Sequence, residues 1–190
     1  MTWYTFFKFV HVAAATVWVG GALMIQAFAF RIVRTRDSKR QADFSKDSEL
    51  VGMRVFIPAT WILLIAGIAM MINADLPWDQ NWIVFGLIAF ALSFIVGAGF
   101  LGPEGGRIAA LIEKEGYDSP AALARIRRIL LISRCELVIL MTVIWSMVVK
   151  PTGNDGWFWG ALAVMLAGIV AVVLAYRRGE QPMPAPATEL

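Results

Sequence analysis

The chain has 190 residues, of which 59% are hydrophobic and 16% are charged, and its formal net charge at pH 7 is +3. Soluble domains carry about 25% charged residues, so this composition, with a mean hydropathy of +0.68, excludes a water-soluble globular domain and predicts an integral membrane protein. The single cysteine, Cys135, excludes an intrachain disulfide and a zinc site built from cysteines. No nucleic-acid-binding motif occurs in the sequence, so the expected partner is the lipid bilayer and not nucleic acid.

The first long apolar stretch, residues 3–30, contains the only histidine of the chain, His11. A helix needs about 20 apolar residues to cross a bilayer, so this stretch is long enough to span it. On a helical period, its polar, aromatic and small side chains fall close to one face. The residues of this face are Tyr4, Lys8, His11, Ala15, Trp18, Ala22 and Gln26. Such a face is expected to turn towards other helices and away from the lipid.

Four further apolar stretches follow in the chain. The five predicted spans are residues 3–30, 53–72, 82–101, 129–149 and 157–176. The charged segment that begins at Arg31 predicts an amphipathic or irregular connection outside the lipid. Gly102-Pro103 is expected to stop or bend the third span, and residues 104–117 are expected to form a helix on the membrane surface. Ser119 and Pro120 are typical of the start of a helix that leads into the fourth span.

The distribution of lysine and arginine predicts the orientation of the spans. All of these residues except Lys8 and Lys150 lie in the segments after the first, third and fifth spans or at the neighbouring ends of spans. Positive charges collect on the cytoplasmic side, so the N-terminus is predicted outside and the C-terminus inside. The sequence therefore predicts an all-α bundle of five transmembrane helices, one domain over residues 1–176, in a bacterial inner membrane. Residues 177–190 are rich in proline and predict a disordered cytoplasmic tail.

His11 is the first candidate for a functional residue, because a histidine inside a membrane span is costly. Met70, Met71 and Met147 are predicted at the same depth, and imidazole and thioether groups are ligands for Cu(I) and for haem iron. These four residues therefore form a candidate metal site. The alternative is that His11 hydrogen-bonds to a backbone carbonyl or a hydroxyl of another helix, while the methionines only fill the core.

Glu136 is the second candidate, because it lies within the fourth predicted span. An unpaired carboxylate there would cost several kcal/mol or stay protonated. Arg54, Arg31 and Gln26 are predicted at a compatible depth, so we expect these residues to form a structural polar cluster with Glu136. A proton or ion relay is the alternative, but the second, third and fifth spans contain no carboxylate to continue it.

The first span also carries a motif with a family resemblance. Lys8-x-x-His11, followed by Trp18-Val19-Gly20-Gly21, resembles the first helix of CopD-type copper-resistance membrane proteins and is similar to that of HemJ-type protoporphyrinogen oxidases. With Phe100-Leu101-Gly102-Pro103-Glu104, the whole chain resembles a family of uncharacterised bacterial integral membrane proteins. The HemJ resemblance implies that His11 is a haem ligand, with Lys8 and Trp18 in the same cofactor site.

Three functions are compatible with these patterns. The first is the binding of haem b or copper through His11. The second is that of a non-catalytic accessory subunit of a larger redox or photosynthetic complex, which contacts other membrane subunits or a second copy of the chain. The third is a HemJ-like protoporphyrinogen oxidase. No complete catalytic motif occurs in the chain, which favours a protein that is not an enzyme.

Overall fold

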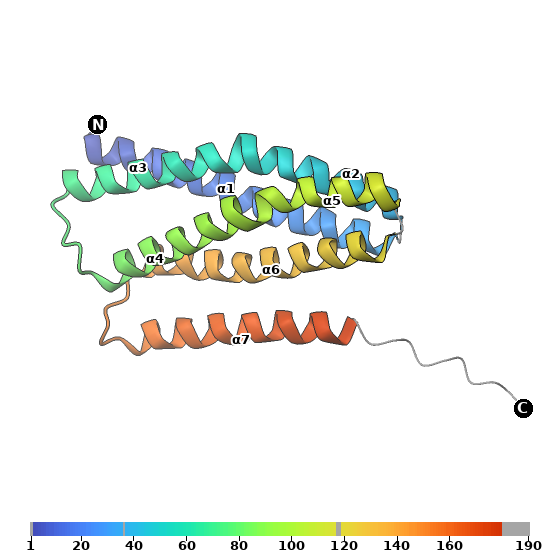
Figure 1. Cartoon of the computed structure of the whole chain (residues 1–190). Helices are drawn as coiled ribbons and strands as arrows, with labels where there is room; N and C mark the ends of the chain where they lie inside the picture. The colour runs from blue at the N-terminus through green and yellow to red at the C-terminus, as the bar shows by residue number, and fades with distance from the viewer. Residues whose placement is uncertain (1, 36, 117–118, 180–190) are drawn as a thin grey trace, which may run out of the picture.

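The computed structural model describes residues 2–35, 37–116 and 119–179 of the chain (Figure 1). The helices are, in chain order, α1 (Trp3–Arg34), α2 (Ser38–Val51), η1 (Gly52–Phe56), α3 (Ile57–Asn73), α4 (Asn81–Val96), η2 (Gly97–Leu101), α5 (Gly102–Glu115), α6 (Pro120–Val149) and α7 (Gly156–Gly179). The described residues contain no strand. Residues 177–179 belong to α7, and the remainder of the predicted tail, residues 180–190, lies outside the described residues.

Five helical rods are long and apolar enough to cross a membrane. They are Trp3–Ile32, Lys39–Asn73, Asn81–Glu115, Pro120–Val149 and Gly156–Arg177. This confirms the all-α bundle of five membrane-spanning helices. The second and third rods are longer than predicted, because α2 continues into α3 and α4 continues into α5. The charged segment after α1 is therefore helical from Ser38 onwards, and α5 is not a separate surface helix.

A five-residue π-helical turn joins the two halves of each long rod. In η1 the backbone N–H of Ile57 donates to the carbonyl of Gly52, and in η2 the N–H of Gly102 donates to the carbonyl of Gly97. A proline follows each turn directly, since Pro58 comes after Ile57 and Pro103 after Gly102.

Proline explains both wide turns. It has no N–H, and its ring clashes with the carbonyl four residues earlier, so a regular α-helical turn is disfavoured before it. A π-turn bonds each N–H to the carbonyl five residues earlier and lets the helix pass the proline. Of the two outcomes expected at Gly102-Pro103, a stop or a bend, the stop does not occur, because the helix continues to Glu115 through the wide turn.

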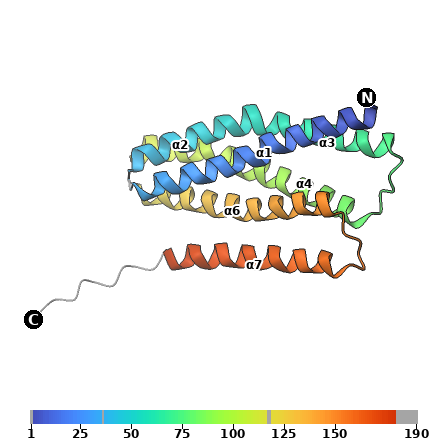
Figure 2. The ribbon, with the colours of Figure 1, turned by 180° about the vertical axis from the view of Figure 1, so that it is seen from behind.

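The first four rods pack as a bundle, and α7 lies on its outside. Contacts join α1 to α3, α2 to α5, and α4 and α1 to α6, while α7 packs along α6. Figures 1 and 2 show α7 at the edge of the molecule, next to α6 and away from α1 and α3.

The two ends of the bundle differ in charge. The N-terminus and the α3–α4 and α6–α7 connections lie at one end, and the α1–α2 and α5–α6 connections lie at the other (Figure 1). We call the second the basic end, because exposed basic side chains gather in the segments that meet there. They include Arg31, Arg34, Lys39, Arg40, Lys46, Arg107, Lys114, Arg127 and Arg128. At the opposite end, the Lys150 ammonium lies 4.9 Å from the centre of the Trp82 ring.

Two clusters of buried apolar residues hold the rods together. One lies at the basic end between α2, α5 and α6 and consists of Ala42, Ile108, Ile112, Ala122 and Ile126. The other lies between α1, α3 and α6 and consists of Trp18, Val19, Ala59 and Leu140. The α6 helix contributes to both clusters. It begins as predicted, with the Ser119 hydroxyl accepting from the N–H of Ala122 and Pro120 in the first turn.

A buried ion pair fixes α5 against α6. The side chain of Glu104 is on α5 and only 4% exposed, and it pairs with Arg107 at 3.0 Å and with Arg125 of α6. The two arginines satisfy both carboxylate oxygens, so the charge of Glu104 is balanced although the residue is buried.

Replacing Glu104 by Gln should destabilise the bundle, because the amide carries no charge to pair with two arginines. Since the arginine side chains are 59% and 43% exposed, solvent screens the pairs. We expect the free energy of unfolding to fall by about 1–2 kcal/mol. Circular dichroism during a denaturing-detergent titration measures this change. Glu113→Gln, an exposed position on the same helix, is the control, and equal stability of the two variants would contradict a role of the ion pair.

Candidate functional site

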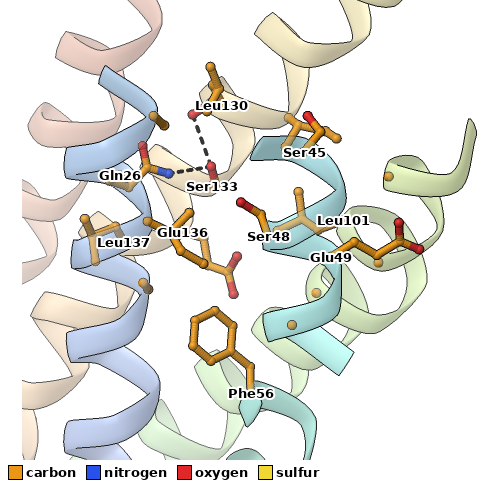
Figure 3. A pocket seen from close by; sticks show the side chains of 18 of the residues that line it. Gln26, Ser45, Ser48, Glu49, Phe56, Leu101, Leu130, Ser133, Glu136 and Leu137 are labelled. Carbon is orange, nitrogen blue, oxygen red and sulfur yellow. Dashed lines mark hydrogen bonds between the residues drawn. The ribbon is translucent and has the colours of Figure 1, made fainter. Parts of the chain in front are cut away.

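A cavity of about 180 Å³ lies inside the bundle, between the two apolar clusters (Figure 3). Its wall contains Ile126 of the cluster at the basic end and Trp18 and Leu140 of the other cluster. All of the helices from α1 to α6 and both π-turns contribute to the wall. Most of the wall is apolar, so the cavity is a candidate binding site for a small molecule.

Both π-turns border this cavity. Gly52, Met53 and Phe56 line it from η1, and Gly97 and Leu101 line it from η2. Wide turns of this kind are frequent at functional sites. The sequence carries a sign of them, since a proline follows each of the two glycines at the same spacing of six positions.

Several polar side chains project into the otherwise apolar wall. They are Gln26, Gln41, Ser45, Ser48, Glu49, Thr60, Ser93, Ser133 and Glu136. Gln26 and Ser133 satisfy one another, because the Gln26 amide donates to the Ser133 hydroxyl at 2.5 Å. Gln26 also accepts from Nε of Arg134 at 3.4 Å. This pair joins α1 to α6 beside the cavity.

The side chains of Glu136, Ser93 and Ser48 have no hydrogen bond like the one between Gln26 and Ser133. The Ser93 and Ser48 hydroxyls are buried and have no hydrogen-bond partner in the structure. Ser93 faces the Glu136 carboxylate, but no hydrogen bond of normal length joins them. Figure 3 shows the Glu136 carboxylate pointing into the cavity above the Phe56 ring, with the Ser48 hydroxyl directed into the same space. The cavity therefore presents a carboxylate and two free hydroxyls to any molecule inside it.

The wall is acidic. Among the described residues that line it, Glu49 and Glu136 are the only ionisable side chains, and none is a lysine, arginine or histidine. The Glu49 carboxylate lies over Gly105 of α5, where a Cβ atom would come within 2.5 Å of its Oε2 atom. Glu136 is the ionisable side chain that points into the cavity (Figure 3).

The predicted polar cluster forms only in part. Gln26 and Glu136 both line the cavity, as expected from their predicted depth. Arg31, at the end of α1, and Arg54, in η1, are exposed and do not line it. The long side chains of these arginines remain on the surface, so neither forms an ion pair with Glu136.

The predicted ligand His11 lies between α1 and α3. Its Nδ1 atom is 2.9 Å from the carbonyl oxygen of Leu63, and Gly67 leaves room for the ring, since a Cβ there would be 3.1 Å from Nδ1. A carbonyl only accepts, so Nδ1 is the donor in this contact, which leaves Nε2 as the nitrogen that a metal could bind. Lys8 is exposed, while Trp18 is buried and meets Phe90 edge to face at 6.2 Å between ring centres.

The predicted methionine ligands lie in the helix contacts around these groups. Met71 is buried and Met70 half-buried on α3, and the methyl group of Met147 packs against Gly86 of α4. Within the part of the chain that the structure describes, no group of three or more His, Cys, Asp or Glu side chains could hold a metal ion.

Ser48, Ser93 and Glu49 were not among the predicted site residues. The periodicity of one helix does not show which residues of another helix it meets. The available signal was the repeated spacing of glycine and proline, which places a wide turn in each of two helices at the border of one cavity.

Comparison with known protein families finds one match. Residues 5–151 match a family described as predicted integral membrane protein (DUF2269). The match covers more than half of the chain and includes every residue of the cavity wall. No curated protein matches the chain, and no solved structure matches it.

Proposed function

The chain belongs to the DUF2269 family of predicted integral membrane proteins, and we propose that it binds a small, mostly apolar molecule inside its helical bundle. The observation that carries this proposal is the cavity between the two apolar clusters, with Glu136, Ser93 and Ser48 directed into it. An apolar pocket with a few convergent polar groups is the usual form of a small-molecule site.

The volume limits the size of the ligand. Drug-sized ligands occupy sites of about 300–1,000 Å³, and this cavity has about 180 Å³. An apolar cavity of about 150 Å³ holds one benzene molecule. The cavity therefore fits a single ring with one or two additional heavy atoms, or one end of a longer amphipathic molecule.

The unpaired hydroxyls support the proposal independently of the volume. A buried hydroxyl without a partner costs about 1–3 kcal/mol. A bound molecule with a polar group would restore the missing hydrogen bonds of Ser93 and Ser48. Most buried polar groups in proteins have such a partner.

Filling the cavity tests this function. Ala22 lines the cavity from α1, whereas Ala27 of the same helix is exposed. We expect benzyl alcohol to bind the purified full chain saturably in non-ionic detergent, and Ala22→Phe to weaken this binding at least tenfold, because the ring occupies the space. Isothermal titration calorimetry with protein-free micelles as blank measures the affinity.

The matched control is Ala27→Phe, which adds the same side chain outside the cavity and should bind benzyl alcohol as the wild type does. Absence of saturable binding to the wild type, or equal binding by Ala22→Phe and Ala27→Phe, would refute the proposal.

A second candidate is the binding of haem b or copper through His11, and one contact favours it. A metal-binding histidine commonly donates its other ring N–H to a backbone carbonyl, which fixes the ring and leaves one nitrogen free. The contact between Nδ1 and the Leu63 carbonyl has this form. The same contact would also be expected for a histidine with a purely structural role. A second ligand for the metal or haem iron would have to come from Met70, Met71, Met147 or another chain.

Spectroscopy and metal analysis of the purified chain distinguish a ligand role of His11 from a structural role. If His11 is a ligand, the purified chain should show a Soret band or contain copper by elemental analysis, and His11→Gln should lose it. The control Gln26→Leu removes a polar group from the same helix and should keep the metal or haem. A wild-type protein without either signal, after expression with haem precursor and copper, would exclude this candidate.

A further inference from the structure

We propose that the molecule in the cavity carries a positively charged amino group, which pairs with the carboxylate of Glu136. This inference rests on the proposed binding function and specifies its ligand class. It follows from the charges of the wall, the unpaired hydroxyls and a comparison of Glu136 with the buried Glu104.

The charges of the wall favour a cation. The wall contains two carboxylates and no basic side chain. In a medium of low dielectric constant, charges interact much more strongly than in water, and an anionic ligand would find no positive partner among the described residues of this wall. A positive group would supply the partner that a buried carboxylate needs.

The hydroxyls match the donors of an ammonium group. An ammonium has three N–H donors and no acceptor. The Glu136 carboxylate can accept one of these bonds, and the Ser93 and Ser48 hydroxyl oxygens, which have no partner in the structure, can accept two more. All three side chains belong to the same wall.

The chain shows how it satisfies a buried carboxylate with its own residues. Glu104 is buried at the basic end and pairs with Arg107 and Arg125. Glu136 has no such pair, because Arg31 and Arg54 are exposed and Arg134 contacts Gln26. Beside Glu104, arginine side chains act as the counter-ions. Among the described residues, no such counter-ion lies beside Glu136, and the cavity has space there for the positive group of a ligand.

A pair of probes of similar size tests the ligand class. Benzylammonium and benzyl alcohol have the same ring and differ in the charge of the polar group. We expect benzylammonium to bind the wild-type chain at least tenfold more tightly than benzyl alcohol, measured by isothermal titration calorimetry in non-ionic detergent. Glu136→Gln should bring the ratio of the two affinities close to one, while Glu113→Gln should leave it unchanged.

The outcomes separate this inference from the proposed function. If both probes bind with equal affinity and Ala22→Phe weakens both, the cavity is a binding site but the inference of a cationic ligand is wrong. If the ratio is unchanged in Glu136→Gln, Glu136 is not the partner. If neither probe binds the wild type, the proposed function itself fails. The comparison on the wild-type chain requires no variant, so it remains decisive even if Glu136→Gln does not fold.

Discussion

The arrangement of the bundle depends on the backbone hydrogen bonding of two helices that contain proline. In lipid, an unpaired backbone N–H or carbonyl costs several kcal/mol, so a proline within a span must be accommodated by the turn before it. Here both helices widen that turn, at Gly52–Phe56 and at Gly97–Leu101. A wide turn contains an additional residue, which rotates the helix faces before and after it relative to one another. The two long helices that contain η1 and η2 therefore pack tightly on either side of these π-turns. The space between the two π-turns stays open as the cavity.

The two apolar clusters and the cavity thus result from one cause. At the basic end, α2, which precedes η1, joins α5, which follows η2, and α6 in the cluster around Ile108. On the other side of η1, α3 joins α1 and α6 in the cluster around Trp18. Helix association in a membrane relies on close packing and on interhelical hydrogen bonds, because lipid is as apolar as the helices. The hydrogen bond between Gln26 and Ser133 supplies such a link from α1 to α6 next to the open space. The walls of the cavity are therefore held on both sides, which keeps it from collapsing.

The sequence predicts the number of spans well, because length and hydropathy determine whether a helix can cross a bilayer. It also predicts the start of α6, since Ser119 and Pro120 act through local backbone chemistry. It does not predict the continuity of the helices through Pro58 and Pro103, because a single proline is compatible with a stop, a bend or a wide turn. For a related reason, the sequence does not show whether Arg31 or Arg54 reaches Glu136, and the described residues contain no such ion pair. Depth along a helix is readable from the sequence, but the direction of a long arginine side chain is not.

The candidate sites can be ranked by the ion-pair and hydrogen-bond partners that each polar group already has within the protein. Glu104 has two arginine partners, and the structure already accounts for its burial. His11 has one ring nitrogen bound to the Leu63 carbonyl, which suits a ligand and a structural residue alike. Ser146 has no partner, but the space beside it is only about 10 Å³, and a water needs about 10–15 Å³. Among the described residues, unpaired buried hydroxyls and a cavity large enough for an organic molecule occur together at Ser93 and Ser48, beside Glu136. A bound molecule with a polar group would supply partners for these atoms, so the cavity carries the functional argument further than His11 does.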